Sequence, residues 1–124
     1  MNKLCRETGV GLIPWGPLHA GMLARPASSH KSTDRSSGKD DMTAQETEIV
    51  NRVEKIAKKR GWPMSVVAMA WMMNPRRGVA APIIGFSKPE RMDEALQVRG
   101  KSLTDEEMDH LEEPYQSLPI QGHT

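Results

Sequence analysis

Apolar residues recur at helical spacing in two neighbouring stretches in the middle of the chain. Thr43 and Glu46 have the spacing of a capping box, and apolar residues then follow every three or four positions until Gly61. The next run, residues 64–73, is crowded enough with apolar side chains to predict a helix buried on most sides, with its methionines as core packing. The pattern therefore predicts an amphipathic helix followed at once by a buried one.

Two shorter apolar runs, residues 10–13 and 79–84, lack polar alternation and are typical of strands buried in a parallel sheet. Their order among the helices is the alternation that gives an α/β fold. Two such strands cannot form a parallel sheet with a core of its own, because each needs neighbours on both edges. The sequence therefore predicts part of a larger α/β structure, whose exposed strand edges favour self-association.

Helices are also predicted at both ends of this pattern. Residues 2–8 end at Gly9, as expected for a helix with glycine just past its C-terminus. A final helix is expected to begin with a capping box formed by Thr104 and Glu107, and to stop near Pro114.

Two stretches have too few apolar residues to predict regular structure. Residues 25–41 are rich in serine, lysine, arginine and aspartate, so a mobile polar loop is expected, and its place after a strand favours a lid. Residues 115–124 are expected to form a loosely held tail.

The segment after the second apolar run is typical of a phosphate site. Ser87 and Glu90 have capping-box spacing, and Pro89 suits a first helical turn. The free N–H groups of such a helix start attract anions, and Lys88 and Arg91 add positive charge beside them. The alternative is an ordinary strand-to-helix connection with solvated charges.

The first apolar run also ends in a candidate site. Trp15 follows the predicted strand directly, within a segment that two glycines and a proline keep irregular. Ligands bind preferentially at the carboxyl ends of parallel strands. The alternative is that Trp15 packs against the following helix.

Composition narrows the class of protein. A length of 124 residues predicts one domain, and a formal net charge of +1 argues against a nucleic-acid-binding protein. Cys5 is the only cysteine, which indicates a reducing, cytoplasmic setting, and no apolar run is long enough to span a membrane. No metal-ligand spacing links the four histidines, so no metal site is expected.

Residues 9–18 and 84–91 together resemble the last quarter of an aldo-keto reductase, and residues 67–71 resemble that family's helix between its seventh and eighth strands. The likeness is to fungal members related to aryl-alcohol dehydrogenases. It implies the C-terminal portion of a (β/α)₈ TIM barrel, about two βα units plus a C-terminal helix, incomplete as a barrel. Residues 1–124 would then form a partial NADP-dependent oxidoreductase domain.

The resemblance implies a site for NADP(H). In the family, the residue at Trp15 stacks on the nicotinamide, the turn that follows approaches the pyrophosphate, and the residue at Glu94 lies near the adenosine ribose. The 2′-phosphate pocket corresponds to Ser87, Lys88 and Arg91. The complete set implied is Trp15, Gly16, Pro17, Leu18, Gly21, Gly85, Phe86, Ser87, Lys88, Arg91 and Glu94.

The family reduces aldehydes and ketones with NADPH, but its catalytic Asp, Tyr, Lys and His belong to the first five strands. No catalytic residue is therefore assigned, and the chain is interpreted as a C-terminal fragment that does not reduce carbonyls alone. One alternative is a noncatalytic nucleotide-binding or subunit-interaction protein. Another is a small helical adaptor that binds through Arg76, Arg77 and the methionine-rich helix.

Overall fold

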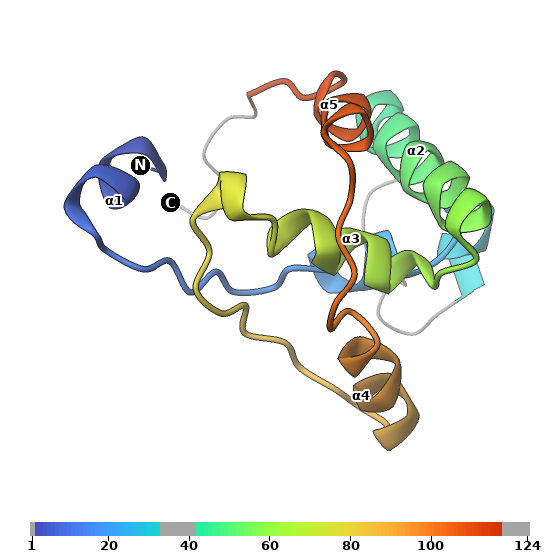
Figure 1. Cartoon of the computed structure of the whole chain (residues 1–124). Coiled ribbons are helices and arrows are strands. Elements are labelled where there is room, and N and C mark those ends of the chain that lie inside the picture. Colours follow the sequence, from blue (N-terminus) through green and yellow to red (C-terminus); the bar gives the residue numbers. More distant parts are fainter. Residues whose placement is uncertain (1, 33–41, 118–124) are drawn as a thin grey trace, which may run out of the picture.

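The computed structural model describes residues 2–32 and 42–117, which form a set of helices joined by extended segments (Figure 1). Three short 3₁₀ helices, η1 to η3, accompany five α-helices. In chain order the elements are α1 (Asn2–Thr8), η1 (His19–Ala24), η2 (Ala27–Ser32), α2 (Ala44–Arg60), α3 (Met64–Met72), η3 (Pro75–Arg77), α4 (Pro89–Leu96) and α5 (Asp105–Glu112).

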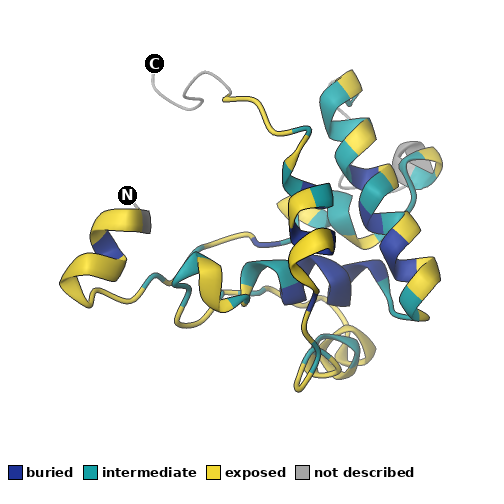
Figure 2. Ribbon diagram, turned by 45° about the horizontal axis from the view of Figure 1, so that its top comes forward, coloured by how far each residue is buried: buried dark blue, intermediate teal, exposed yellow. Residues whose placement is uncertain are grey.

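Helix α3 lies at the centre, and its sequence explains why. Every residue from Met64 to Ala70 is buried, so α3 has no face left for solvent over that length. It packs against α2, η1 and α4 (Figures 1 and 2). The predicted buried helix is confirmed over Met64–Ala70, where Met64 and Met69 pack in the interior as expected. The other two methionines of the predicted run are not core residues, because Met72 is half-buried and Met73 is 46% exposed.

Helix α2 shows the predicted amphipathic pattern. The Thr43 hydroxyl accepts a hydrogen bond from the Glu46 N–H, and the Glu46 carboxylate accepts one from the Thr43 N–H, which completes the capping box. At the other end Gly61 adopts φ 63°, a left-handed conformation that glycine takes without strain. Both predicted ends of this helix are confirmed.

One apolar cluster joins α2, α3 and α5. Its buried members come from all three helices and from the segment before α5, so these elements share a single core. The cluster comprises Val50, Val53, Ile56, Ala57, Met64, Val67, Ala70, Leu103, Met108 and Leu111.

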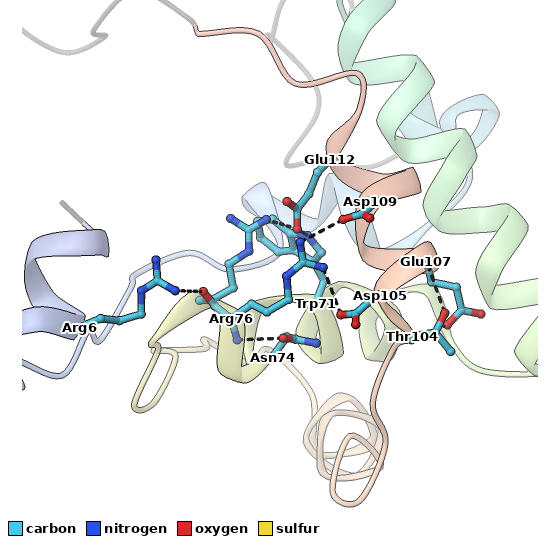
Figure 3. Close-up of polar contacts among 10 residues, drawn as sticks. Arg6, Trp71, Asn74, Arg76, Thr104, Asp105, Glu107, Asp109 and Glu112 are labelled. Carbon is cyan, nitrogen blue, oxygen red and sulfur yellow. Dashed lines mark hydrogen bonds and ion pairs between the residues drawn. The ribbon is translucent and has the colours of Figure 1, made fainter.

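Ion pairs fasten α5 to the turn that follows α3 (Figure 3). Arg76 contacts Asp105 and Asp109 at 3.2 and 3.0 Å, and Arg77 forms an ion pair with Glu112. The guanidinium of Arg77 also lies 4.0 Å from the centre of the Trp71 ring. Because both arginines already have partners, the adaptor hypothesis loses its proposed binding charges.

The predicted strands are wrong as strands. The two segments pair in parallel only through isolated bridges, Leu12 with Val79 and Trp15 with Ile83. They were also expected to be buried, yet Ile13 is 64% exposed and Ile83 is 51% exposed. The two extended segments have no further strands beside them to continue the hydrogen-bonded ladder, so they pair only through isolated bridges. They also have no layer of helices over them, so their apolar side chains stay exposed.

The predicted polar loop is partly wrong. Residues Ala27–Ser32 form η2, and partly buried Ala27 packs against the core cluster, so local apolar contact orders this part. The rest of the predicted loop, 33–41, lies outside the described residues. Of the predicted tail, residues 115–117 are exposed, and the remainder is also outside the described part.

No helix in the described part of the chain is long and apolar enough to cross a membrane.

A buried carboxylate anchors the start of α5. Glu107 is 5% exposed, and Arg60 binds both of its oxygens, with Nε at 2.9 Å from Oε1 and Nη2 at 2.6 Å from Oε2. The Thr104 N–H donates to the same carboxylate and completes the predicted capping box. The Arg60 hydrogen bonds lower the pKa of Glu107 from 4.5 to about 2, against the opposing effect of burial.

Glu107→Gln should lower the free energy of unfolding at pH 7 by about 2 kcal/mol, because it removes a charged, two-point contact while Arg60 keeps some hydration. A carboxylate whose pKa is depressed on folding contributes stability above its unfolded pKa, which here is near 4.5. The difference between the two proteins should therefore shrink as the pH falls from about 4.5 towards about 2. Urea unfolding of both proteins at several pH values measures this difference in the free energy of unfolding.

Glu106→Gln is the matched control, because Glu106 is the exposed neighbour in the same helical turn. It should change stability by less than about 0.5 kcal/mol. Equal effects of the two substitutions would show that the Arg60 contact does not stabilise the fold.

Candidate functional site

A groove of about 990 Å³ opens where the two bridged segments end. Trp15 and Ile83 pair with each other and both line the groove, so parallel pairing brings the carboxyl ends of the two segments to one place. Helix α3 contributes Ser65 and Met69, and α4 contributes Arg91 among others. The groove therefore depends on elements far apart in the sequence.

Nine of the eleven residues predicted to bind a cofactor line this groove. They come from the turn after Trp15, from the segment before α4, and from α4 itself. These nine are Trp15, Gly16, Pro17, Leu18, Gly21, Gly85, Phe86, Arg91 and Glu94.

Ser87 and Lys88 do not line it, and the predicted capping box at Ser87 is wrong. Pro89 is the first residue of α4, which makes Lys88 the N-cap, and no side chain caps this helix. Glu90 is therefore the second helical residue and cannot make the reciprocal contact that the third position makes. Both Ser87 and Lys88 are exposed.

The turn after Trp15 has an unusual backbone. His19 and Ala20 have φ values of 48° and 54°, and Gly21 has φ 91°. Only Gly21 among the three can adopt this left-handed region without steric cost. The turn is closed by hydrogen bonds from the His19 N–H to the Gly16 carbonyl and from the Gly21 N–H to the Leu18 carbonyl, at 3.0 and 2.9 Å.

His19 connects this turn to α2. Its Nε2 lies 3.6 Å from Oε1 of Glu46, the residue that closes the α2 capping box. The pKa of Glu46 is lowered, first by the Thr43 N–H and to a smaller extent by His19. His19 also lines the groove.

Glu94 faces the groove from α4 and accepts a hydrogen bond from the Ser65 hydroxyl. Ser65 is itself buried, so this contact ties α4 to the central helix α3. The carboxylate that the resemblance implied near a ribose is therefore held in a fixed place by a neighbouring hydroxyl.

Sequence reasoning missed several lining residues, chiefly Arg25, Ser65 and Met69. Ser65 and Met69 are four residues apart, so they share one face of α3. The sequence did not indicate which face of α3 lines a site, because apolar residues occur on all sides of this helix. Arg25 was assigned to the polar loop, and its charge gave no separate signal. No cluster of three or more metal-binding side chains occurs in residues 2–32 and 42–117.

Comparison with known proteins identifies the class. A model of the Aldo/keto reductase family matches residues 1–116. The chain belongs to this family.

Among curated relatives, the chain is 50% identical to Aldo-keto reductase AMT2 of Alternaria alternata, over all of this chain and 34% of that protein. It is 41% identical to the putative aryl-alcohol dehydrogenase C977.14c of Schizosaccharomyces pombe, over 98% of this chain and 35% of that protein. It is 40% identical to the versiconal hemiacetal acetate reductase of Aspergillus parasiticus, over 93% of this chain and 35% of that protein. The chain thus spans about a third of the length of the curated relatives it matches.

The left-handed backbone at Ala20 gives a direct test of the turn. Ala20→Gly should raise the free energy of unfolding by up to about 1 kcal/mol, because glycine removes the steric cost of φ 54°. The same exchange inside helix α4, Ala95→Gly, should instead lower it by about 1 kcal/mol. Thermal and urea unfolding measure both, and destabilisation by both substitutions would mean that Ala20 is not strained in solution.

Proposed function

We propose that this chain forms the coenzyme-binding part of an NADPH-dependent reductase of aldehydes and ketones. It would correspond to about two βα units and the C-terminal helix of a (β/α)₈ barrel, with a small-molecule carbonyl substrate in the complete enzyme. The supporting observation is that nine residues implied by family resemblance, from three separate segments, line one groove. The free thiol of Cys5 supports a reducing, cytoplasmic setting.

The proposed coenzyme lies along the groove with its two ends at different segments. Trp15 is 86% exposed at the end of its segment, so its ring face is available to stack on a nicotinamide. Arg91, in the first turn of α4, forms no ion pair with a described carboxylate and can bind a 2′-phosphate. Glu94, fixed by Ser65, would accept hydrogen bonds from a ribose.

The chemistry of carbonyl reduction needs more than this groove supplies. Hydride transfer leaves an oxyanion, which requires a positioned acid and nearby donors. Of the residue types in the family's catalytic set, the described lining residues include one histidine, His19, but no aspartate, tyrosine or lysine. Tyr115, which follows α5, is 70% exposed and does not line the groove. This observation also favours the second candidate function, a noncatalytic nucleotide-binding protein that uses the same groove.

The first test is coenzyme preference. NADPH should bind the chain more tightly than NADH, and Arg91→Ala should reduce this preference by about tenfold or more, because a charge-assisted contact to phosphate contributes about 1.5–3 kcal/mol. Titration followed by tryptophan fluorescence measures both affinities. Bound NADPH should not be consumed when an aromatic aldehyde is added.

Arg99→Ala is the control, because Arg99 is exposed and does not line the groove. It removes the same charge and should leave the preference unchanged. Equal binding of NADPH and NADH before any substitution would show that the groove holds no 2′-phosphate pocket. Enzyme-dependent consumption of NADPH would show that catalytic groups are present that the lining residues do not reveal.

We also propose that copies of this chain associate through the exposed edges of the bridged segments. Ile13 and Ile83 are exposed there, together with Val10 and Trp15, and both segments offer backbone groups that a further strand could pair with.

Size-exclusion chromatography with light scattering should therefore show a dimer or larger species that dissociates on dilution. Ile13→Lys should shift it towards the monomer, because a buried lysine at the edge opposes strand pairing. The core substitution Met108→Leu should not change the oligomeric state, because Met108 is buried in the core cluster away from the edge. A compact monomer at high concentration would contradict the proposal.

A further inference from the structure

The turn after Trp15, residues 16–21, needs support from other parts of the structure. His19, Ala20 and Gly21 all have positive φ values, and only Gly21 adopts such a conformation without steric cost. Other residues keep this backbone only where the surrounding structure holds them in it. Helices α3 and α2 pack against η1, which begins at His19. Contacts with these helices therefore contribute to the order of a segment that lines the groove.

One polar contact reaches from this turn to α2. The Nε2 atom of His19 lies 3.6 Å from Oε1 of Glu46, the third residue of α2. The other carboxylate oxygen, Oε2, accepts hydrogen bonds from the N–H and the hydroxyl of Thr43, at 2.8 and 2.9 Å. The capping box thus fixes the carboxylate through one oxygen and leaves the other one for His19.

The strength of this contact depends on the charge of His19. A separation of 3.6 Å is longer than an ordinary hydrogen bond, so attraction between opposite charges is the main component of the contact. A histidine side chain changes its charge between about pH 5 and 8. Glu46 stays ionised over that range, because the Thr43 N–H lowers the pKa of its carboxyl below the ordinary value. The contact is therefore strong only when His19 is protonated.

The other charges around His19 do not reverse this effect. The positive end of the α2 dipole opposes a cation with about half a charge, whereas Glu46 supplies a full negative charge. Arg25 lines the same groove and also opposes protonation, while α4 contributes both Arg91 and Glu94, whose charges have opposite signs. Helix α3 has no titratable side chain. Glu46, the carboxylate in ion-pair contact with His19, therefore sets the sign.

We propose that His19 and Glu46 form a pH-sensitive latch, which holds the turn against α2 when His19 is protonated and releases it when His19 is neutral. The latch acts whatever ligand the groove takes, so this inference is independent of the proposed coenzyme function. Its effect is modest, because His19 is 66% exposed and water and salt weaken exposed ion pairs. The opening equilibrium of the turn should change by about two- to fivefold.

Two substitutions remove either charge while they keep the local backbone. Glu46→Gln keeps the capping box, because glutamine at the third helical position makes the same reciprocal contact. His19→Asn keeps the turn, because asparagine tolerates a positive φ better than most residues. Glu48→Gln is the control, since it removes a charge from the same helix where the partner is Arg52. Circular dichroism spectra establish that each variant is folded.

Hydrogen exchange of residues 16–24, followed by mass spectrometry at about pH 5.5 and about pH 8, measures the order of the turn. Labelling times are scaled for the intrinsic effect of pH on exchange. The unmodified chain should be protected about two- to fivefold more at the lower pH, and added salt should reduce this difference. Glu46→Gln and His19→Asn should each abolish the difference, whereas Glu48→Gln should retain it.

A double-mutant cycle separates the latch from a structural role of either residue alone. Urea unfolding of the unmodified chain, both single variants and the double variant gives the coupling between the two positions. This coupling should change the unfolding equilibrium constant by about two- to fivefold at about pH 5.5, and it should vanish at about pH 8.

Three outcomes would overturn the proposal. Equal coupling at both pH values would mean that the contact does not depend on charge. A pH dependence that persists in Glu46→Gln would mean that another titratable group controls the turn. Hydrogen exchange of the unmodified chain that does not change with pH, beyond the intrinsic effect, would mean that the turn has no such latch.

Discussion

The burial of helix α3 on all sides is the constraint on which the rest of the structure depends. Its residues from Met64 to Ala70 are inaccessible, so every neighbouring element must supply a surface to cover them. Helix α2 packs against α3 and also against α5, while η1 and α4 pack against α3 as well. Val67 and Ala70 belong to the core cluster, whereas Ser65 and Met69 line the groove. The same helix therefore supports both the hydrophobic core and the candidate site.

The polar contacts of this structure fall into two groups with different consequences. Around α5, arginines and carboxylates neutralise each other, and Arg60 binds both oxygens of Glu107 in a partly buried contact. Such pairs position elements relative to one another. In the groove, by contrast, Arg25 and Arg91 keep their charge uncompensated by any described carboxylate. Uncompensated cations beside an open groove favour an anionic ligand, which is consistent with the coenzyme proposal.

Membership of the aldo/keto reductase family and the geometry of the groove agree in one respect. The resemblance implied that residues from two distant segments share a coenzyme, and parallel bridging brings the ends of those segments together at Trp15 and Ile83. The chain spans about a third of its curated relatives, and its two bridged segments leave apolar side chains exposed. We propose that a barrel would continue at those exposed edges, and that copies of this chain would associate there.

The sequence by itself determined the helices that have strong local signals. The capping boxes at Thr43 and Thr104, the glycine at Gly61 and the apolar run of α3 each act within a few residues, so their structures follow from local chemistry. Only the tertiary structure decided that the two short apolar segments do not form strands, because a hydrogen-bonded ladder depends on neighbouring strands that no local pattern supplies. It also decided the groove: Ser65, Met69 and Arg25 join it through packing between distant elements, and Pro89 displaced the helix cap from Ser87 because its fixed backbone set where α4 begins.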